Sequence, residues 1–287
     1  MKSSQIIHIG YPRTATTWLQ NEFYPKVKNY KYYSIKEFKK NHITDNIKIL
    51  NKIKIDDNKN FIFSWEKYTG DDNKNIEEYA KQIYNFFPSA SIILFLRNQI
   101  DIYISRYSSY IKHGGTYSFE KYFFRQKKEH HLAETFNYFE IIDIYKKLFG
   151  DKNIEVFLYE DFKENNELFI KKYNTIFDFN IDCDNINYSE KNTSIYQKSF
   201  KIFRVLNLFY SGNIKYKVSI LPSLVLQNRI KKIIYKINNY NKSNLKKPKK
   251  YINQNHIEFL RKYYKFSNNN LLKQYPNLNL QKYNYPI

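Results

Sequence analysis

One stretch near the N-terminus, residues 5–22 with the sequence QIIHIGYPRTATTWLQNE, constrains the fold of this chain more than any other. It opens with IIHI, a short apolar run rich in β-branched residues, which predicts a buried strand. The GYP that follows ends the strand, because glycine permits a positive φ and proline fixes φ and removes a donor. From Thr14 or Ala15 onward the apolar spacing predicts a helix. A strand, a tight turn and a helix N-terminus in this order form an anion-binding site, since the first N–H groups of a helix lack partners within it.

The turn fits the Walker A motif of magnesium-nucleotide kinases poorly. That motif, G-x4-G-K-[ST], would start at Gly10 and require glycine and lysine where the chain has Ala15 and Thr16, and only Thr17 fits. The cation lies inside the turn instead, as Arg13. This poor match makes a P-loop kinase a weak hypothesis for the function of the chain. An ordinary strand–turn–helix with a capping threonine also remains a possible interpretation of these residues.

The same turn, YPRTATTW, resembles the 5′-phosphosulfate loop of the sulfotransferase family, whose usual form is [YVG]-P-[KR]-[ST]-G-T-T-W. The donor of that family is 3′-phosphoadenosine 5′-phosphosulfate (PAPS). The resemblance implies that the donor is bound by Pro12, Arg13, Thr14, Ala15, Thr16, Thr17 and Trp18. Ala15 replaces the usual glycine, so the alanine would be strained if the backbone there needs a positive φ.

A second block follows the most apolar run of the chain, SIILFLR at residues 91–97, which predicts a buried strand ending in a cation. The sequence from this cation onward, RNQIDIYISRY, resembles the family's 3′-phosphate block, R-N-P-x-D-x3-S-x-Y, with Gln99 in place of proline. The resemblance implies that Arg97 and Ser105 hold the 3′-phosphate. Arginine suits a terminal phosphate because its planar guanidinium makes two charge-assisted hydrogen bonds.

Two residues are candidates for catalysis. Glu66 follows the predicted strand FIFSW at residues 61–65, and the carboxyl ends of parallel strands face the ligand crevice. It is the candidate base for the acceptor proton, as the resemblance also suggests; a solvated loop carboxylate is the alternative, and His113 is the next candidate. Arg13 would balance the charge that develops on the bridging oxygen as the S–O bond breaks. Trp18 either stacks on adenine or belongs to the core.

Strands and helices alternate from residue 4 to 175, which predicts an α/β fold with a P-loop-like parallel sheet flanked by helices and a helical C-terminal part. We expect a single sulfotransferase-like domain over residues 1–287, with the cofactor-binding core at 1–180 and a helical extension at 190–287. The patterns predict a strand within 153–162, one short helix plus loops in 26–60, and helices at 75–87, 98–110, 118 onward, 132–149, 163–177, 196–210, 223–238 and 252–275.

The charge and the residue composition of the chain limit the partners and cofactors to be expected. The net charge of +21 favours a polyanionic partner, an acidic substrate or peripheral contact with an anionic membrane surface, and no specific nucleic acid is expected. The single cysteine, Cys183, excludes an internal disulfide and a cysteine zinc site, and no metal is expected. With neither a signal peptide nor a long apolar run, the chain is expected to be cytoplasmic. The basic, low-complexity residues 238–250 would either clamp an anionic cofactor or, as we favour, contact solvent or membrane.

The favoured function is sulfuryl transfer from PAPS to a hydroxyl, or with less support an amine, of an acceptor. Aromatic and basic residues in 30–60 and 110–130 would suit a glycan or a lipid-linked sugar. A P-loop kinase would instead need magnesium and ATP. A non-catalytic basic module would bind polyanions or membrane with steep salt dependence and ignore PAPS.

Overall fold

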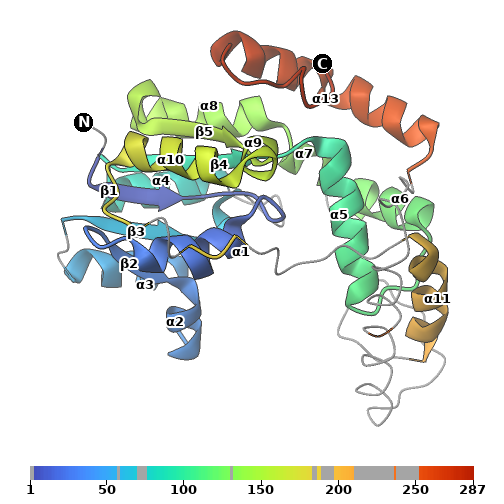
Figure 1. The fold of residues 1–287 in the computed structure, drawn as a ribbon, viewed down its shortest axis with the longest axis horizontal. Helices are drawn as coiled ribbons and strands as arrows, with labels where there is room; N and C mark the ends of the chain where they lie inside the picture. Colours follow the sequence, from blue (N-terminus) through green and yellow to red (C-terminus); the bar gives the residue numbers. More distant parts are fainter. Residues whose placement is uncertain are drawn as a thin grey trace. The chain divides into compact units, whose positions relative to one another are not determined.

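The computed structural model describes residues 3–56, 59–69, 76–129, 132–182, 186–188, 197–209, 236 and 252–287 (Figure 1). The chain divides into two compact units. The first comprises Met1–Asn98, His131–Ser189 and Tyr263–Ile287, and the second comprises Gln99–His130 and Glu190–Lys262. Each unit contains residues from both the predicted core at 1–180 and the predicted C-terminal extension at 190–287. That these two parts form a single domain stays a prediction.

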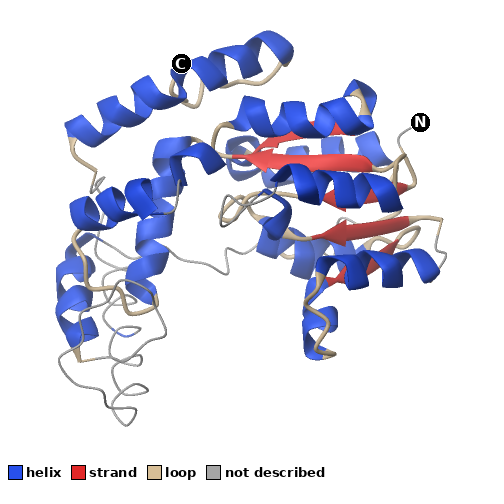
Figure 2. Ribbon diagram, turned by 180° about the vertical axis from the view of Figure 1, so that it is seen from behind, coloured by secondary structure: helices blue, strands red, loops and turns tan. Residues whose placement is uncertain are grey.

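The first unit contains a five-stranded sheet in the order β2-β3-β1-β4-β5. The strands of this sheet are drawn as red arrows in Figure 2. Its strands are β1 (Gln5–His8), β2 (Lys31–Ser34), β3 (Phe61–Ser64), β4 (Ser91–Leu96) and β5 (Ile154–Leu158). Every pairing is parallel, so all the carboxyl ends lie at one edge of the sheet. Strand β1 lies in the middle, with β3 on one side and β4 on the other. The predicted α/β fold with a P-loop-like parallel sheet flanked by helices is confirmed.

The helices of the first unit are α1 (Thr16–Trp18), α2 (Ile35–Lys40), α3 (Asn46–Ile55), α4 (Ile76–Phe86), α7 (Leu132–Thr135), α8 (Tyr138–Phe149), α9 (Tyr159–Glu164) and α10 (Asn166–Phe177). Helix α1 continues into a π-helix at Leu19–Phe23 and a 3-10 helix at Tyr24–Lys26, and further 3-10 helices lie at Glu66–Thr69 and Asp151–Asn153. Helix α13 (Gln254–Gln274) has residues in both units. None of the helices among the described residues combines the length and apolarity needed to cross a membrane.

The second unit contains α5 (Gln99–Lys112), α6 (Phe119–Glu129) and α11 (Gln197–Leu208). Asn207 fastens α11 to the end of α5, because its side-chain amide donates to the carbonyl of Ile111 at 2.9 Å and to that of Gly115 at 2.8 Å. The rings of Tyr107 and Phe200 stack with their centroids 5.5 Å apart. The predicted helix at 223–238 and the basic linker at 238–250 lie outside the described residues, apart from Lys236.

Three predicted boundaries are wrong. Residues 26–60 contain β2 and α3 besides the predicted short helix; α3 buries Ile49, Leu50 and Ile53, so tertiary packing sustains a lysine-rich segment whose pattern is weak. The predicted helix 132–149 is two helices, interrupted where Phe136 packs against Tyr11 with ring centroids 5.7 Å apart. The helix predicted at 163–177 is also two helices, because Asn165 leaves the helical conformation and caps α10 by accepting from the Leu168 N–H at 2.9 Å.

Candidate functional site

The three sequence blocks that predict the site follow three neighbouring strands. The Ile9 N–H, just beyond β1, donates to the carbonyl of Ile93 in β4 at 3.0 Å, and the Trp65 N–H, just beyond β3, donates to that of His8 at 3.0 Å. Glu66 therefore follows the strand on one side of β1, and Arg97 follows the strand on the other. The segment at residues 10–17, where the sequence predicts an anion-binding site and which is therefore called the anion-binding loop, leaves the sheet between them. This is the edge where ligands bind in open parallel sheets.

The anion-binding loop has two left-handed residues, Arg13 with φ 73° and Ala15 with φ 63°. The hydroxyls of Thr14 and Thr16 both donate to the carbonyl of Tyr11, at 2.5 and 3.0 Å. Both threonines are buried, whereas Thr17 is exposed. The side chains of Thr14 and Thr16 thus form hydrogen bonds within the loop, whereas the side chain of Thr17 faces solvent. Pro12, between Tyr11 and Arg13, is partly buried.

The start of the loop passes close to a buried histidine. A Cβ atom on Gly10 would lie 2.2 Å from Nε2 of His8, so only glycine fits there. His8 is fully buried, with Nδ1 3.0 Å from the Ser64 hydroxyl, and burial lowers its pKa from 6.5 to about 3. The imidazole is therefore neutral near pH 7, and the charged side chain within residues 10–17 is that of Arg13.

The conformation of Ala15 makes a direct prediction about stability. A left-handed backbone conformation destabilises a residue that carries a Cβ atom by about 1–2 kcal/mol. Substitution by glycine recovers only part of this energy, because glycine also has more conformational freedom in the unfolded chain. We expect Ala15→Gly to raise the free energy of unfolding by about 0.5–1 kcal/mol in urea denaturation. Ala80→Gly, at a buried position in the middle of α4, serves as the contrasting control and should lower it by about 1 kcal/mol or more, because the helix penalty of glycine adds to the loss of a buried methyl group. Equal losses for both variants would contradict a left-handed residue 15.

Arg97 connects the end of β4 to the anion-binding loop. Its Nη1 atom donates to the carbonyl of Arg13 at 2.9 Å, and its guanidinium carbon lies 4.5 Å from the centre of the Tyr159 ring. Its Nε atom is buried without a hydrogen-bond partner among the described residues. Arg97 therefore supports the left-handed loop and retains one unsatisfied donor. No signal in the sequence analysis predicted a role for Tyr159 in this site.

Two further predicted site residues, Glu66 and Trp18, also belong to the first unit. Glu66 is the first residue of a 3-10 helix and is partly buried, and its carbonyl accepts from the Thr69 hydroxyl at 3.0 Å. Trp18 donates through Nε1 to the carbonyl of Asn187 at 2.9 Å, and its ring stacks on Tyr188 at 5.9 Å. It packs against the main core cluster, and stacking on adenine stays a prediction.

Ser105 and His113 belong to the second unit. Ser105 is partly buried on α5, and its contact with a phosphate stays a prediction. His113 follows α5 and is exposed, with Nδ1 2.7 Å from the carbonyl of Ser109. Within the described ranges, no group of three or more His, Cys, Asp or Glu side chains could hold a metal ion.

A model of the family described as Sulfotransferase domain matches residues 3–276. The similar solved structures include a sulfotransferase from Alicyclobacillus acidocaldarius, at 15% identity over 70% of this chain and 84% of that chain, with a TM-score of 0.42. They also include mouse sulfotransferase SULT7A1 complexed with PAP, at 15% identity over 63% of this chain and 60% of that chain, with a TM-score of 0.41. No curated protein matches the chain.

The family model spans both sequence blocks and nearly all of the chain, so the assignment does not depend on the loop motif alone. It confirms the family that YPRTATTW and RNQIDIYISRY resemble. The chain belongs to the sulfotransferase domain family.

Proposed function

We propose that this sulfotransferase moves a sulfuryl group from PAPS to a hydroxyl of an acceptor. Family membership makes the protein a transferase enzyme, and the proposal adds the donor and the acceptor. The observation that carries the choice of donor is the contact between Arg97 and the carbonyl of Arg13, which joins the two predicted phosphate-binding blocks. A donor with phosphates at both the 5′ and the 3′ position would use both blocks at once.

In this proposal the loop from Pro12 to Trp18 binds the 5′-phosphosulfate through backbone N–H groups and the hydroxyls of Thr16 and Thr17. The Thr16 hydroxyl donates to the Tyr11 carbonyl, so to bind the donor it would have to turn that proton toward a phosphosulfate oxygen or share it between the two acceptors. Arg97 and Ser105 would bind the 3′-phosphate. The unsatisfied Nε of Arg97 supports this role, because a phosphate oxygen would supply the partner that a buried donor needs.

For the transfer itself, Glu66 would take the proton of the acceptor hydroxyl as the hydroxyl oxygen bonds to sulfur. Arg13 would stabilise the negative charge on the bridging oxygen as the bond between that oxygen and sulfur breaks. The products are the sulfated acceptor and 3′,5′-adenosine bisphosphate. No residue needs a metal ion for these steps.

We infer that the acceptor is a carbohydrate or a lipid-linked sugar. Support comes from the second unit, where Lys121 lies 4.3 Å and Arg125 5.4 Å from the centre of the Tyr117 ring, a combination suited to sugars near anionic groups. A cytoplasmic location with contact to an anionic membrane surface completes the proposal. It is supported by the sequence from 191 to 257, which has no Asp or Glu, and by the exposed side chains of Ile202, Val205 and Phe209.

The proposal predicts that 3′,5′-adenosine bisphosphate binds in the presence of a metal chelator. At a concentration one hundred times Kd it should stabilise the protein by about 2.7 kcal/mol, measured as a thermal shift. AMP, which lacks the 3′-phosphate, is the matched comparison. At the same concentration as the bisphosphate it should stabilise the protein less.

Magnesium-ATP and heparin test the two rival functions in the same assay. A shift with ATP that depends on magnesium would favour a P-loop kinase. A salt-sensitive shift with heparin and none with the bisphosphate would favour a basic binding module. An equal shift with AMP and the bisphosphate would contradict a 3′-phosphate site.

A further inference from the structure

The peptide group between Arg97 and Asn98 is held at both of its polar atoms by side chains. The Tyr138 hydroxyl donates to the Arg97 carbonyl at 2.5 Å, and the Asn98 N–H donates to Oε1 of Glu160 at 2.9 Å. A peptide group is planar, so bonds to its oxygen and its N–H together fix its orientation. Because this peptide group is bonded directly to the Arg97 Cα, its orientation limits where the Arg97 side chain can point.

Glu160 has a second partner in the C-terminal strap, which we define as residues 282–286. Its Oε2 atom accepts from the hydroxyl of Tyr285 at 2.9 Å. Tyr285 is fully buried, and burial raises its pKa well above 10, so near pH 7 it keeps the proton that it donates. One carboxylate thus bridges the peptide after Arg97 and the C-terminal strap.

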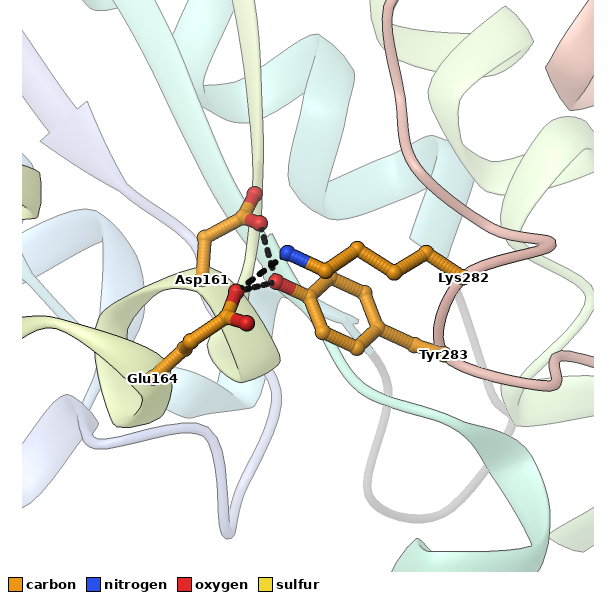
Figure 3. Close-up of polar contacts among 4 residues, drawn as sticks. All are labelled: Asp161, Glu164, Lys282 and Tyr283. Carbon is orange, nitrogen blue, oxygen red and sulfur yellow. Dashed lines mark hydrogen bonds and ion pairs between the residues drawn. The ribbon is translucent and has the colours of Figure 1, made fainter.

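The strap is held from two sides. The side-chain amide of the buried Asn98 donates to the carbonyls of Tyr283 at 2.9 Å and Asn284 at 2.8 Å. In addition, the Tyr283 hydroxyl contacts Asp161 at 2.7 Å and Glu164 at 2.6 Å, and Lys282 pairs with Glu164 (Figure 3). Glu160 and Glu164 lie on the same short helix, α9, but only Glu160 touches the peptide after Arg97.

Helix α9 also supplies the ring beneath the guanidinium. Tyr159, the residue before Glu160, lies under Arg97 at 4.5 Å. Two consecutive residues of α9 therefore contact the Arg97 region from its two ends, Tyr159 at the guanidinium and Glu160 at the backbone. Arginine has a long, flexible side chain, and each such contact removes orientations that would not serve a ligand.

We propose that Glu160 is a positioning residue for Arg97: by holding the Asn98 N–H and the Tyr285 hydroxyl, it aims the guanidinium at the anion-binding loop and at the 3′-phosphate. This role rests on the proposed use of PAPS. It makes the C-terminal strap part of the donor site, although no strap residue needs to touch the donor.

The test compares Glu160→Ala with Glu164→Ala, which loosens the same strap without touching the Arg97–Asn98 peptide. Titration calorimetry with 3′,5′-adenosine bisphosphate and with AMP gives the two affinities. We expect Glu160→Ala to weaken the bisphosphate roughly tenfold or more, the effect of one charge-assisted hydrogen bond, and to weaken AMP less. Glu164→Ala should leave both affinities unchanged. Equal weakening by the two variants would overturn the proposal, because Glu160 would then only fasten the strap.

Two milder variants cover the case in which Glu160→Ala does not fold. Glu160→Gln keeps an oxygen for the Asn98 N–H and should retain most of the affinity. Tyr285→Phe removes one of the two hydrogen bonds to Glu160 and should lower the bisphosphate affinity by less than tenfold relative to wild type. A tenfold or greater loss of bisphosphate affinity in Glu160→Gln would argue against positioning through Asn98.

A second readout needs no ligand and separates this inference from the proposed function. Amide hydrogen exchange at Asn98 should become faster in Glu160→Ala and Tyr285→Phe and stay unchanged in Glu164→Ala. If wild type fails to bind the bisphosphate, the proposed donor is wrong, and exchange still decides whether Glu160 holds this peptide. Unchanged exchange at Asn98 in Glu160→Ala would overturn the inference whatever the ligand.

Discussion

Replacing Arg13 by alanine should lower kcat roughly 10²–10³-fold at every pH, the loss seen when one preorganised donor is removed from a developing charge. The contact that fixes this part of the loop uses the Arg13 carbonyl and not its side chain, so the loop should survive the substitution. Arg13→Lys should keep much of the activity, because a point charge can still reach the bridging oxygen although the planar fork is lost. Steady-state measurement of 3′,5′-adenosine bisphosphate release gives both values.

The backbone of Arg13 offers a control for strain. At φ 73° an alanine carries the same left-handed penalty as the arginine, whereas Arg13→Gly removes the penalty together with the charge. If charge is what matters, Arg13→Ala and Arg13→Gly should be equally slow although the glycine variant is more stable. Wild-type kcat in either variant would remove Arg13 from the mechanism.

The second large effect is expected at Glu66, which in the proposed mechanism acts on the acceptor side of the transferring group. Glu66→Gln should cost about 10²–10⁴ in kcat while the affinity for PAPS stays intact, because the amide keeps the shape but cannot accept the acceptor proton. The acidic limb of the pH–rate profile should disappear with it. The measurement needs a true acceptor, with donor affinity determined separately by calorimetry.

His113 provides the comparison for Glu66. It is exposed after α5 in the second unit and is the alternative candidate base. His113→Asn should run near the wild-type rate if Glu66 is the base. A fast Glu66→Gln together with a slow His113→Asn would reverse the assignment.

The sequence alone predicts the elements that build the centre of the sheet. The runs that form β1, β3, β4 and β5 are short, apolar and bounded by glycine, proline or charged residues, so their structure follows from local pattern. The same holds for the order strand, loop and helix around residues 10–17 and for the position of Arg97 at a strand end. Local signals sufficed here because β-branched runs and chain-breaking residues act within a few positions of themselves.

Helix α3 and strand β2 escape this kind of prediction. In α3 only Ile49, Leu50 and Ile53 are deeply buried apolar residues among lysines and asparagines, and the segment gains its stability from what it packs against. Strand β2 is an edge strand of four residues that is held by pairing with β3. Neither segment has a clear local sequence pattern, because each is stabilised by contacts with residues distant in the sequence.

By itself the sequence determined the fold class, the sulfotransferase family and the two blocks that would bind a donor, because each depends on residues close together in the chain. Only the tertiary structure decided that Ala15 is left-handed, that the hydroxyls of Thr14 and Thr16 turn back to Tyr11, and that Arg97 supports the loop. It alone joins Asn98 to Glu160 and to a strap almost two hundred residues later, since the bonds of a buried peptide group go to whatever the fold brings beside it.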